Sequence, residues 1–425
     1  MFAETLEAVK DSPSKRTAYV RFVLAALSVM VLFKTLRFGR WGSYQIRELA
    51  DFDAFHIVAQ QVWRGQLDLV YRFEALVKLQ AEAAQGATGF MPWTYPPQFD
   101  LLLAPLALLP TGIAYLLFIA ATLAAYLLTL RAIAGTHLAH VLVVMFPALA
   151  ITVGCGQNGF LTGALIGLVC LNAERRQIVA GLALGAMVIK PHLAIAMGVY
   201  MLATRRWLAL ATAATVVLTS SLLCTVAFGW PIWRAWLGAI GESAAFLEQG
   251  LYPLLRMIST YAALARAGIP AGLAFWGQAA AAGLALGAVV LAVRLAALQK
   301  LSPAFARGVA VLASVMISPY AYDYDLPMAG IGLALLLPDL ARLASARERG
   351  VLYGLILLAG AYGMLQSARL AAQFGEAAYL AGLEDRFAPA LGGFAMAALL
   401  ALLLRLLWRR LQMTIVLPHL AQPAE

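Results

Sequence analysis

The sequence predicts an all-α polytopic membrane protein that forms a single transmembrane domain over residues 1–425. Hydrophobic residues make up 63% of the chain and charged residues only 12%, whereas soluble domains carry about 25% charged residues. Long Leu- and Ala-rich runs without strand-like alternation indicate helices and exclude a membrane β-barrel. The net charge of +10 follows from basic residues at the ends of apolar segments, so we expect membrane lipids and not nucleic acid as the surroundings.

About twelve hydrophobic segments follow one another along the chain. We expect the first, 19–38, to be an uncleaved anchor after a cytoplasmic tail, 1–18. Segments 99–109 and 113–130 are expected to form one crossing that is broken at Pro110. The others are 138–153, 160–171, 178–189, 193–203, 208–228, 271–298, 305–317, 326–340, 351–365 and 391–407. Several are shorter than the roughly 20 residues of a full crossing, which predicts half-helices packed among longer ones.

The distribution of basic residues predicts the topology. If the segments alternate, the basic pairs 175–176, 205–206 and 409–410 fall on the same side as the N-terminus, which the positive-inside rule makes cytoplasmic. Both termini are then cytoplasmic, and the connections 39–97, 229–269 and 366–389 lie on the outer face. Within the first connection we expect amphipathic surface helices at 55–67 and 70–84.

Two carboxylates and an imidazole follow the first hydrophobic segment, as Asp51, Asp53 and His56. On a helix, Asp53 and His56 share one face and Asp51 points elsewhere. Because Phe52 and Phe55 reduce the solvation of these carboxylates, the group is suited to a general base. A solvated loop with no chemistry is the alternative.

Two cations are expected at the outer end of apolar segments. Lys190 lies beside Pro191 between two apolar segments, where a charge is costly and indicates a function. It could neutralise a phosphate, with His192 as an additional hydrogen-bond donor. Arg256 is a second outer cation. The alternatives are a lysine that extends to the lipid headgroups and an arginine that anchors the interface.

Three further groups contain polar residues at outer turns. Gln157 and Asn158, within a glycine-rich turn, could bind hydroxyls or cap the next helix. Tyr95, before two prolines, could contact substrate or anchor the chain in the interface. The junction Ser318-Pro-Tyr-Ala-Tyr-Asp-Tyr-Asp325 could serve sugar recognition, metal binding or capping, with Asp325 placed to cap the following helix.

The order of these motifs resembles the family 87 glycosyltransferases, bacterial membrane enzymes of the GT-C fold. The resemblance covers roughly residues 51–340. The matching motifs are Asp51-Phe-x-x-Phe55, Trp63-Arg-Gly65, Val70-Tyr71, Tyr95-Pro-Pro97, Ala104-Pro-Leu-Ala-Leu-Leu-Pro110, Gly156-Gln-Asn158, Ala180-Gly-Leu-x-x-Gly185, Lys190-Pro191, Arg205-Arg-Trp207, Leu254-x-x-Met257, Ser318-Pro-Tyr320 and Tyr324-Asp325.

The resemblance implies a GT-C bundle of about twelve helices that transfers a sugar, typically mannose, from a polyprenyl-phosphate sugar with inversion. The acceptor would be a hydroxyl of a lipid or glycan in glycolipid or cell-envelope biosynthesis, on the periplasmic face of the bacterial inner membrane. Asp51 maps onto the essential acid of the first outer loop and would be the catalytic base. The donor phosphate would contact Lys190, His192 and Arg256. The substrate residues would be Asp53, His56, Tyr95, Gln157, Asn158, Tyr320, Asp323 and Asp325, and no cofactor or metal is indicated.

Two other classes of function fit parts of the pattern. A flippase or transporter for polyprenyl lipids would use broken helices such as those around Lys190, but its polar groups should gather near the middle of the membrane. A non-catalytic membrane scaffold would not need Asp51, Lys190 and Asp323 on one face. Formation of a glycosylated product, as opposed to movement of intact lipid, distinguishes the enzyme from the flippase.

Overall fold

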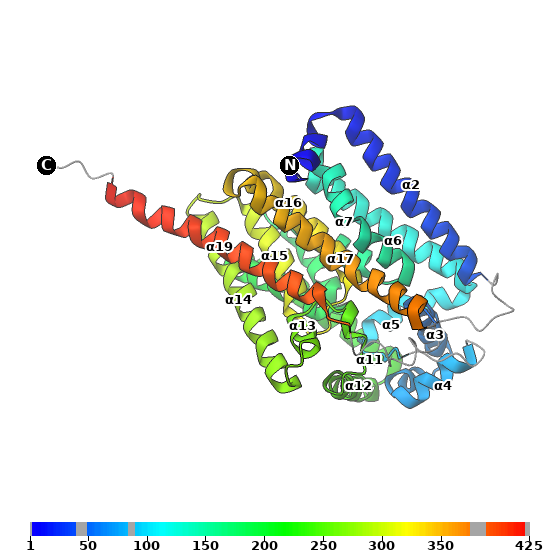
Figure 1. The fold of residues 1–425 in the computed structure, drawn as a ribbon. Helices are drawn as coiled ribbons and strands as arrows, with labels where there is room; N and C mark the ends of the chain where they lie inside the picture. Colours follow the sequence, from blue (N-terminus) through cyan, green and yellow to red (C-terminus); the bar gives the residue numbers. More distant parts are fainter. Residues whose placement is uncertain (1, 40–48, 84–89, 375–387, 421–425) are drawn as a thin grey trace.

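The structure is a computed structural model that describes residues 2–39, 49–83, 90–374 and 388–420. Within these ranges the regular elements are helices, as the sequence predicts, and no strand occurs (Figure 1). A single isolated β-bridge, between Met257 and Tyr322, joins two of the connections there. The expected third connection, 366–389, begins with the end of a long helix, and residues 375–387 lie outside the described ranges.

Among the described residues, six helical stretches are long and apolar enough to cross a membrane, so the chain is a multi-pass membrane protein. Exposed apolar side chains such as Phe22, Leu218 and Val226 cover the outside of these helices, as expected for surfaces that face lipid. The stretches are α2 (Pro13–Phe38), α6 (Thr111–Ala134) together with α7 (Leu138–Cys155), α11 (Trp207–Phe228), α14 (Ala271–Ala297), α17 (Ala346–Phe374) and α19 (Leu391–Leu420).

Two boundaries differ from the sequence prediction for local reasons. The first span begins at Pro13 and not at residue 19, because the Ser12 side chain accepts the Lys15 backbone N–H and Pro13 occupies the first helical position. The helix α6 is 24 residues long, about 36 Å, and crosses without help from the preceding segment. That segment forms the separate elements α5 (Pro97–Leu103) and η3 (Ala104–Leu108).

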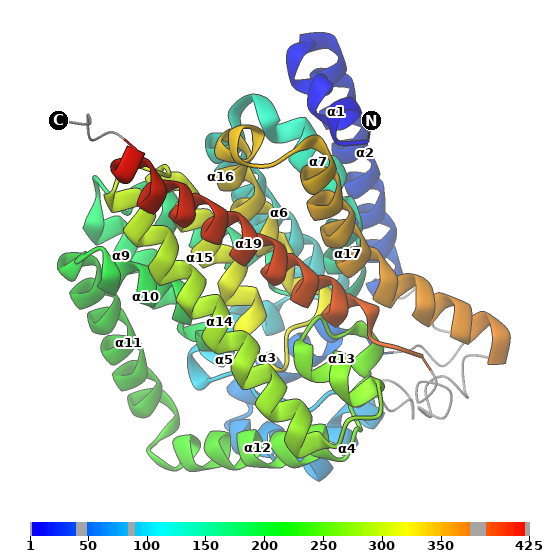
Figure 2. The same ribbon diagram turned by 60° about the vertical axis from the view of Figure 1, so that its left-hand side comes forward.

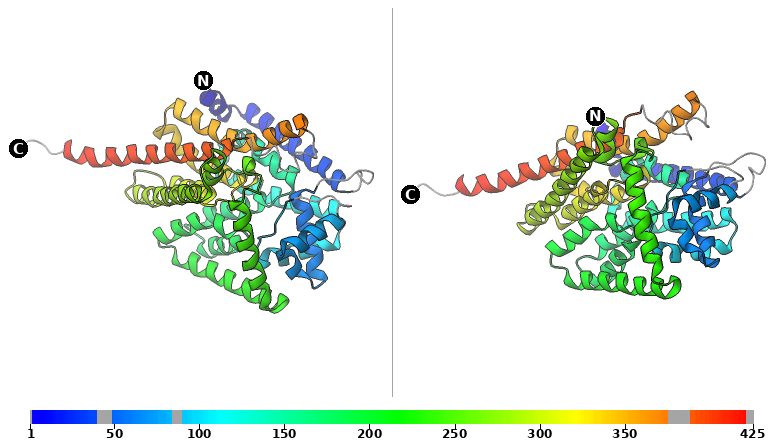
Figure 3. Two further views of the ribbon diagram at one scale, coloured as in Figure 1. Left: turned by 60° about the horizontal axis from the view of Figure 1, so that its bottom comes forward. Right: turned by 90° about the horizontal axis from the view of Figure 1, so that it is seen from below.

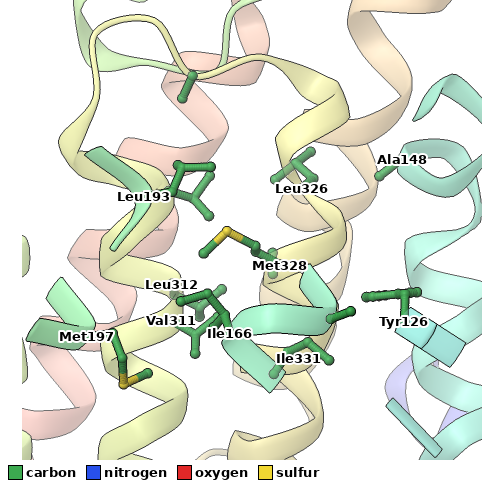
Figure 4. Close-up of a cluster of buried hydrophobic side chains, with 14 of the residues drawn as sticks. Tyr126, Ala148, Ile166, Leu193, Met197, Val311, Leu312, Leu326, Met328 and Ile331 are labelled. Atoms are coloured by element: carbon green, nitrogen blue, oxygen red, sulfur yellow. The ribbon is translucent and has the colours of Figure 1, made fainter. Parts of the chain in front are cut away.

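Shorter helices pack between the long ones, as the sequence predicts. A buried apolar core holds them together, and Figure 4 shows one cluster of it, which includes Ile166, Leu312, Met328 and Tyr126 of α6. Because lipid is as apolar as these side chains, close packing is what stabilises such contacts. The short elements are α8 (Gly159–Asn172), α9 (Gln177–Ala186), η5 (Met187–Ile189), η6 (Pro191–Leu193), α10 (Ile195–Ala203), α15 (Pro303–Ile317) and α16 (Pro327–Leu343).

Most of the remaining helices gather at one end of the bundle, at the bottom of Figure 1, where α12 runs across the ends of the long helices in Figure 2. Figure 3 shows this end, with α4 and α12 on the same side of the molecule; the Phe73 and Phe246 rings join them, 4.8 Å apart. We call it the site end. Its elements are α3 (Asp51–Trp63), η2 (Leu67–Tyr71), α4 (Phe73–Ala83), α5, η3, α12 (Pro231–Glu248), η7 (Leu254–Arg256), α13 (Thr260–Arg266) and η8 (Asp323–Asp325).

The two helices predicted in the first connection exist, but α3 is not a surface helix. It begins at Asp51, four residues before the expected start, and Phe52, Phe55 and Val58 are fully buried. The Phe52 ring packs edge-on against Tyr115 of α6, 5.4 Å away. The apolar face of α3 therefore contacts the bundle and not the lipid headgroups, because α6 provides an aromatic partner there.

The opposite end of the bundle carries the N-terminus, at the top of Figure 1. There α1 (Phe2–Glu7) and η1 (Ala8–Asp11) precede α2, and η4 (Gly135–His137) joins α6 to α7. Glu7 accepts hydrogen bonds from Arg349 and from the Tyr353 hydroxyl, both at 2.7 Å, which fixes α1 on α17. The 18 residues of α7 separate the two ends, a length of about 27 Å.

Candidate active site

The turn between α7 and α8 is the centre of the site end. Gly156 has a positive φ of 73°, and a Cβ at this position would lie 2.5 Å from Cβ of Phe52. A glycine is therefore required both by the backbone and by the close approach of α3. The turn places Gln157 so that its Nε2 donates to Asp51 Oδ1 at 3.2 Å, while its Oε1 accepts from the Tyr95 hydroxyl at 3.0 Å.

Asp51 and its two sequence neighbours have separate surroundings. Asp53 accepts the Ala50 backbone N–H at 2.9 Å and so caps the start of α3. The His56 ring nitrogens lie near the Leu109 carbonyl (3.0 Å) and the Thr111 hydroxyl (3.4 Å), against η3 and α6. In agreement with the prediction that Asp51 points away from the other two, Asp51 bonds to Gln157, whereas the contacts found for Asp53 and His56 go to other groups.

Two buried ion pairs lie at η8. The Arg256 guanidinium donates to Asp323 from Nη2 (2.8 Å) and from Nε (3.2 Å). The Lys190 ammonium donates to Asp325 Oδ1 at 2.5 Å. Both carboxylates are almost fully buried, at 0% and 1% exposure. Because an isolated charge is very costly to bury, each pair exists as a unit.

Asp325 does not cap α16, contrary to the prediction. Its second oxygen, Oδ2, accepts the Tyr322 backbone N–H at 3.2 Å, and the residue before α16, Leu326, makes no side-chain cap. The carboxylate instead closes the turn of η8 on itself through Oδ2 and binds Lys190 through Oδ1. The four carboxylate oxygens of Asp323 and Asp325 are thus all occupied by protein donors.

Tyr324, which was predicted only as part of the Tyr324-Asp325 motif and not as a site residue, links the two ion pairs. Its ring centroid lies 5.1 Å from Lys190 Nζ and 5.8 Å from Arg256 Cζ, within cation–π range. A Cβ at Gly159 would lie 2.0 Å from the Tyr324 carbonyl oxygen, so the glycine lets α8 approach η8. Tyr320 instead packs edge-on against Tyr252, 5.7 Å away.

The Asp51 carboxylate faces this cluster. Burial raises the pKa of Tyr324, and the negative charge of Asp51 is the next largest cause. Burial lowers the pKa of the Arg256 guanidinium, but the charge of Asp323 raises it, and the charge of Asp51 contributes a smaller rise of the same sign. Within the described residues Asp51 contacts no cation, which distinguishes it from the carboxylates of Asp323 and Asp325.

His192 and Asn158 have polar atoms that are available to a ligand. Burial and the adjacent Lys190 charge lower the pKa of His192 to about 4, so the imidazole is neutral at pH 7. Asn158 is fully buried, and neither atom of its side-chain amide has a hydrogen-bond partner in the described part of the chain. It precedes α8 but makes no side-chain cap there, which contradicts the capping alternative for this residue.

A hydrogen-bond network around Asp100, which was not predicted from the sequence, lies next to the site. Asp100 is fully buried, and its carboxyl accepts from Trp93 Nε1 at 2.9 Å and contacts the Tyr71 hydroxyl at 2.5 Å. The same hydroxyl lies 3.0 Å from the Tyr95 carbonyl. Because a hydroxyl has one proton, both contacts are satisfied when Asp100 is protonated and donates to Tyr71. Hydrogen bonds thus connect Asp100 through Tyr71 to the backbone of Tyr95, and the Tyr95 hydroxyl through Gln157 to Asp51.

The fold and the site define a multi-pass helical membrane protein with a buried cluster of acids, cations and tyrosines at one end. The model of Glycosyltransferase family 87 matches residues 93–319, more than half of the chain, and the protein belongs to this family. The predicted resemblance is thereby confirmed, and the protein is a glycosyltransferase. No curated protein and no solved structure showed significant similarity to the chain.

The matched region contains part of the predicted site. Tyr95, Gln157, Asn158, Lys190, His192 and Arg256 lie inside it; Asp51, Asp53 and His56 precede it, and Tyr320, Asp323 and Asp325 follow it. The fold nevertheless joins the flanking residues to the matched ones, through the bond of Asp51 to Gln157 and the two ion pairs.

Proposed function

We propose that this glycosyltransferase moves a sugar, mannose, from a polyprenyl-phosphate sugar to a hydroxyl of a lipid or glycan acceptor, with inversion. The helical bundle would be of the GT-C type in a bacterial inner membrane. Both termini would be cytoplasmic, and the site end would face the periplasm. Family membership supports sugar transfer, and a donor carried by a lipid agrees with a site at the end of a bundle of membrane spans.

The observation that carries the proposal is the free state of Asp51. Asp323 and Asp325 are held by Arg256 and Lys190, whereas Asp51 accepts only from the uncharged amide of Gln157 among the described residues. A carboxylate that is not bound to a cation has oxygens available to accept a proton from a substrate hydroxyl within hydrogen-bond reach, which a general base requires. The Gln157 contact also orients the carboxylate, since the same amide is fixed by the Tyr95 hydroxyl.

In the proposed reaction the acceptor oxygen attacks the anomeric carbon of the donor. The new carbon–oxygen bond forms as the bond between that carbon and the phosphate oxygen breaks. Asp51 takes the hydroxyl proton of the acceptor, and the electron pair of the broken bond leaves with the polyprenyl phosphate. Attack from the face opposite the leaving group inverts the anomeric centre.

The charges of the cluster suit this reaction. Asp51, Asp323 and Asp325 together with Lys190 and Arg256 carry one net negative charge. Proton transfer to Asp51 removes that charge as negative charge grows on the leaving phosphate, so the total charge of the site with its substrate stays constant. This limits the electrostatic cost of the transition state in a poorly solvated site.

The paired cations retain donors for the phosphate. An ammonium has three N–H groups, and Lys190 uses one of them for Asp325. A guanidinium has five, and Arg256 uses Nε and Nη2 for Asp323 and the Cys155 sulfur. The neutral His192 and the unpartnered amide of Asn158 could bind further oxygens of the phosphate or the sugar.

The proposal is tested with purified protein in nanodiscs, radiolabelled polyprenyl-phosphate mannose and a lipid-extract acceptor. We expect a glycosylated product from the wild type and a loss on the order of 10²–10⁴-fold in Asp51→Asn. Asp68→Asn is the matched control, because Asp68 is an exposed acid of the same connection, paired with Arg72, and should remain fully active. Near-normal transfer by Asp51→Asn would refute the role of Asp51. Movement of intact donor between leaflets without product would favour a flippase instead.

A further inference from the structure

A second polar site lies at the opposite end of the bundle. A cavity of about 500 Å³ opens between the start of α2 and the junction of α6 with α7. Its lining includes Arg16, Thr17 and Arg21 of α2, Arg131 of α6 and Thr136 of η4. In Figure 1 the start of α2 and the adjoining ends of α6 and α7 lie at the top, far from α3 and α5. We call it the arginine cavity.

The three arginines of this cavity have no acidic partner. Arg16 is half-buried and the other two are exposed, and none contacts a carboxylate within the described residues. Nearby, Glu7 is already bonded to Arg349 and Tyr353. Three like charges around one cavity repel one another unless an anion enters, so the lining favours a negatively charged ligand.

The chemistry of the lining selects phosphate. Guanidinium groups present paired N–H donors that match phosphate oxygens, and the hydroxyls of Thr17 and Thr136 can add further hydrogen bonds. A cavity of this volume accommodates a phosphate together with a small attached group. Carboxylate ligands would use fewer of these donors.

The surface beside the cavity indicates that the phosphate belongs to a lipid. Leu24 and Leu32 follow Arg21 on one face of α2, at helical spacing, and are 36% and 59% exposed. On α6, Leu128 lies one turn before Arg131 and is 67% exposed. These exposed leucines belong to the lipid-facing surfaces of α2 and α6, along which acyl chains can lie.

We propose that the arginine cavity binds the phosphate headgroup of an anionic membrane lipid, with its acyl chains along α2 and α6. The bound lipid would link the start of α2 to the α6–α7 junction and offset the repulsion among the three arginines. The site is separate from the sugar-transfer site and does not depend on the donor or acceptor used there.

The experiment is a native mass-spectrometry titration of the full, delipidated chain with phosphatidylglycerol and with phosphatidylcholine of the same acyl length. We expect the anionic lipid to bind at least roughly tenfold more tightly. The variant Arg16→Gln/Arg21→Gln/Arg131→Gln should lose this preference. Arg234→Gln is the matched control, because Arg234 is an exposed arginine on α12 at the site end, and it should keep the preference.

Three results would overturn the proposal. The triple variant could keep the preference, which would place the lipid elsewhere. Millimolar inorganic phosphate could displace the lipid and bind equally well to the wild type, which would make the ligand free phosphate. If the triple variant fails to fold, the single variant Arg131→Gln is titrated in its place. An unchanged preference for the anionic lipid in that variant would refute the site. Sugar transfer is measured separately, so failure here leaves the proposed function untouched.

Discussion

The two ends of the bundle hold their cations in opposite ways. At the site end, Lys190 is 7% exposed and paired with Asp325, and Arg256 is paired with Asp323. At the opposite end, Arg16, Arg21 and Arg131 line an open cavity and contact no acid among the described residues. The difference shows that burial forces a charge to find a protein partner, whereas an open cavity leaves it available to an external one.

The largest expected effect comes from breaking one buried pair. Lys190→Met leaves Asp325 buried without a cation and should destabilise the protein by about 3–5 kcal/mol. The double variant Lys190→Met/Asp325→Asn should recover much of this loss, because no uncompensated charge remains. Unfolding in detergent, followed by circular dichroism, measures both.

An exposed pair is the control for that measurement. Arg72 and Asp68 are 64% and 52% exposed, so Arg72→Met should cost less than about 1 kcal/mol. Equal losses in Lys190→Met and Arg72→Met would contradict the argument that burial makes the difference.

The next largest effect on stability is expected at the contact between α8 and η8. In Gly159→Ala the new Cβ would meet the Tyr324 carbonyl oxygen at 2.0 Å, so the helix must shift at a cost of about 1–3 kcal/mol. Because Tyr324 lies between the two cations, sugar transfer should fall as well. Gly154→Ala, in the same turn, meets nothing within 4 Å and should leave the melting temperature and transfer rate nearly unchanged; equal effects would argue against the close contact.

Two substitutions of Asp100 test whether its carboxyl group is protonated or ionised. Asp100→Asn keeps a donor for Tyr71 and an acceptor for Trp93, so transfer should stay within a few-fold of the wild type. Asp100→Leu leaves both partners unsatisfied, which costs about 1–3 kcal/mol for each group. It should also slow sugar transfer, because Tyr95 and Gln157, which position Asp51, lose this support. A comparison of kcat and KM in both variants is the measurement, and inactivity of Asp100→Asn would show that Asp100 acts as a carboxylate.

The smallest expected effect is at the arginine cavity. Without lipid, Arg131→Gln should change the free energy of unfolding by less than about 0.5 kcal/mol, as is usual for exposed side chains. Adding anionic lipid should raise the melting temperature of the wild type and much less that of the variant. A large loss of stability in the lipid-free variant would mean that Arg131 has a structural partner.

Much of the helical pattern could be predicted from the sequence. Apolar runs predicted the long spans and the short helices between them, because the period of hydrophobic residues and the length of a run are local properties. The position of α3 could not be predicted in this way. Its alternating polar and apolar residues fit a membrane surface, and only the Tyr115 ring of α6 shows that the apolar face is covered by protein.

The candidate site was predicted as separate pieces. Asp51, Lys190, Arg256 and the two acids of η8 were identified from residue type and from their places at the ends of apolar runs. The buried Asp100 was missed, since an acid within a short apolar helix carries no signal of its partners. Tyr324 was missed because nothing in the local sequence separates it from Tyr320.

The sequence by itself determined that the chain is an all-helical membrane protein, which family it resembles, and which charged residues lie at the helix junctions. The tertiary structure alone decided that Asp325 pairs with Lys190, 135 positions away, and Asp323 with Arg256, 67 positions away. Hydropathy and spacing are local, whereas ion pairs depend on which distant segments pack together. The fold thereby pairs two of these three acids with cations, and Asp51 has no cation partner among the described residues, which is why we propose it as the base.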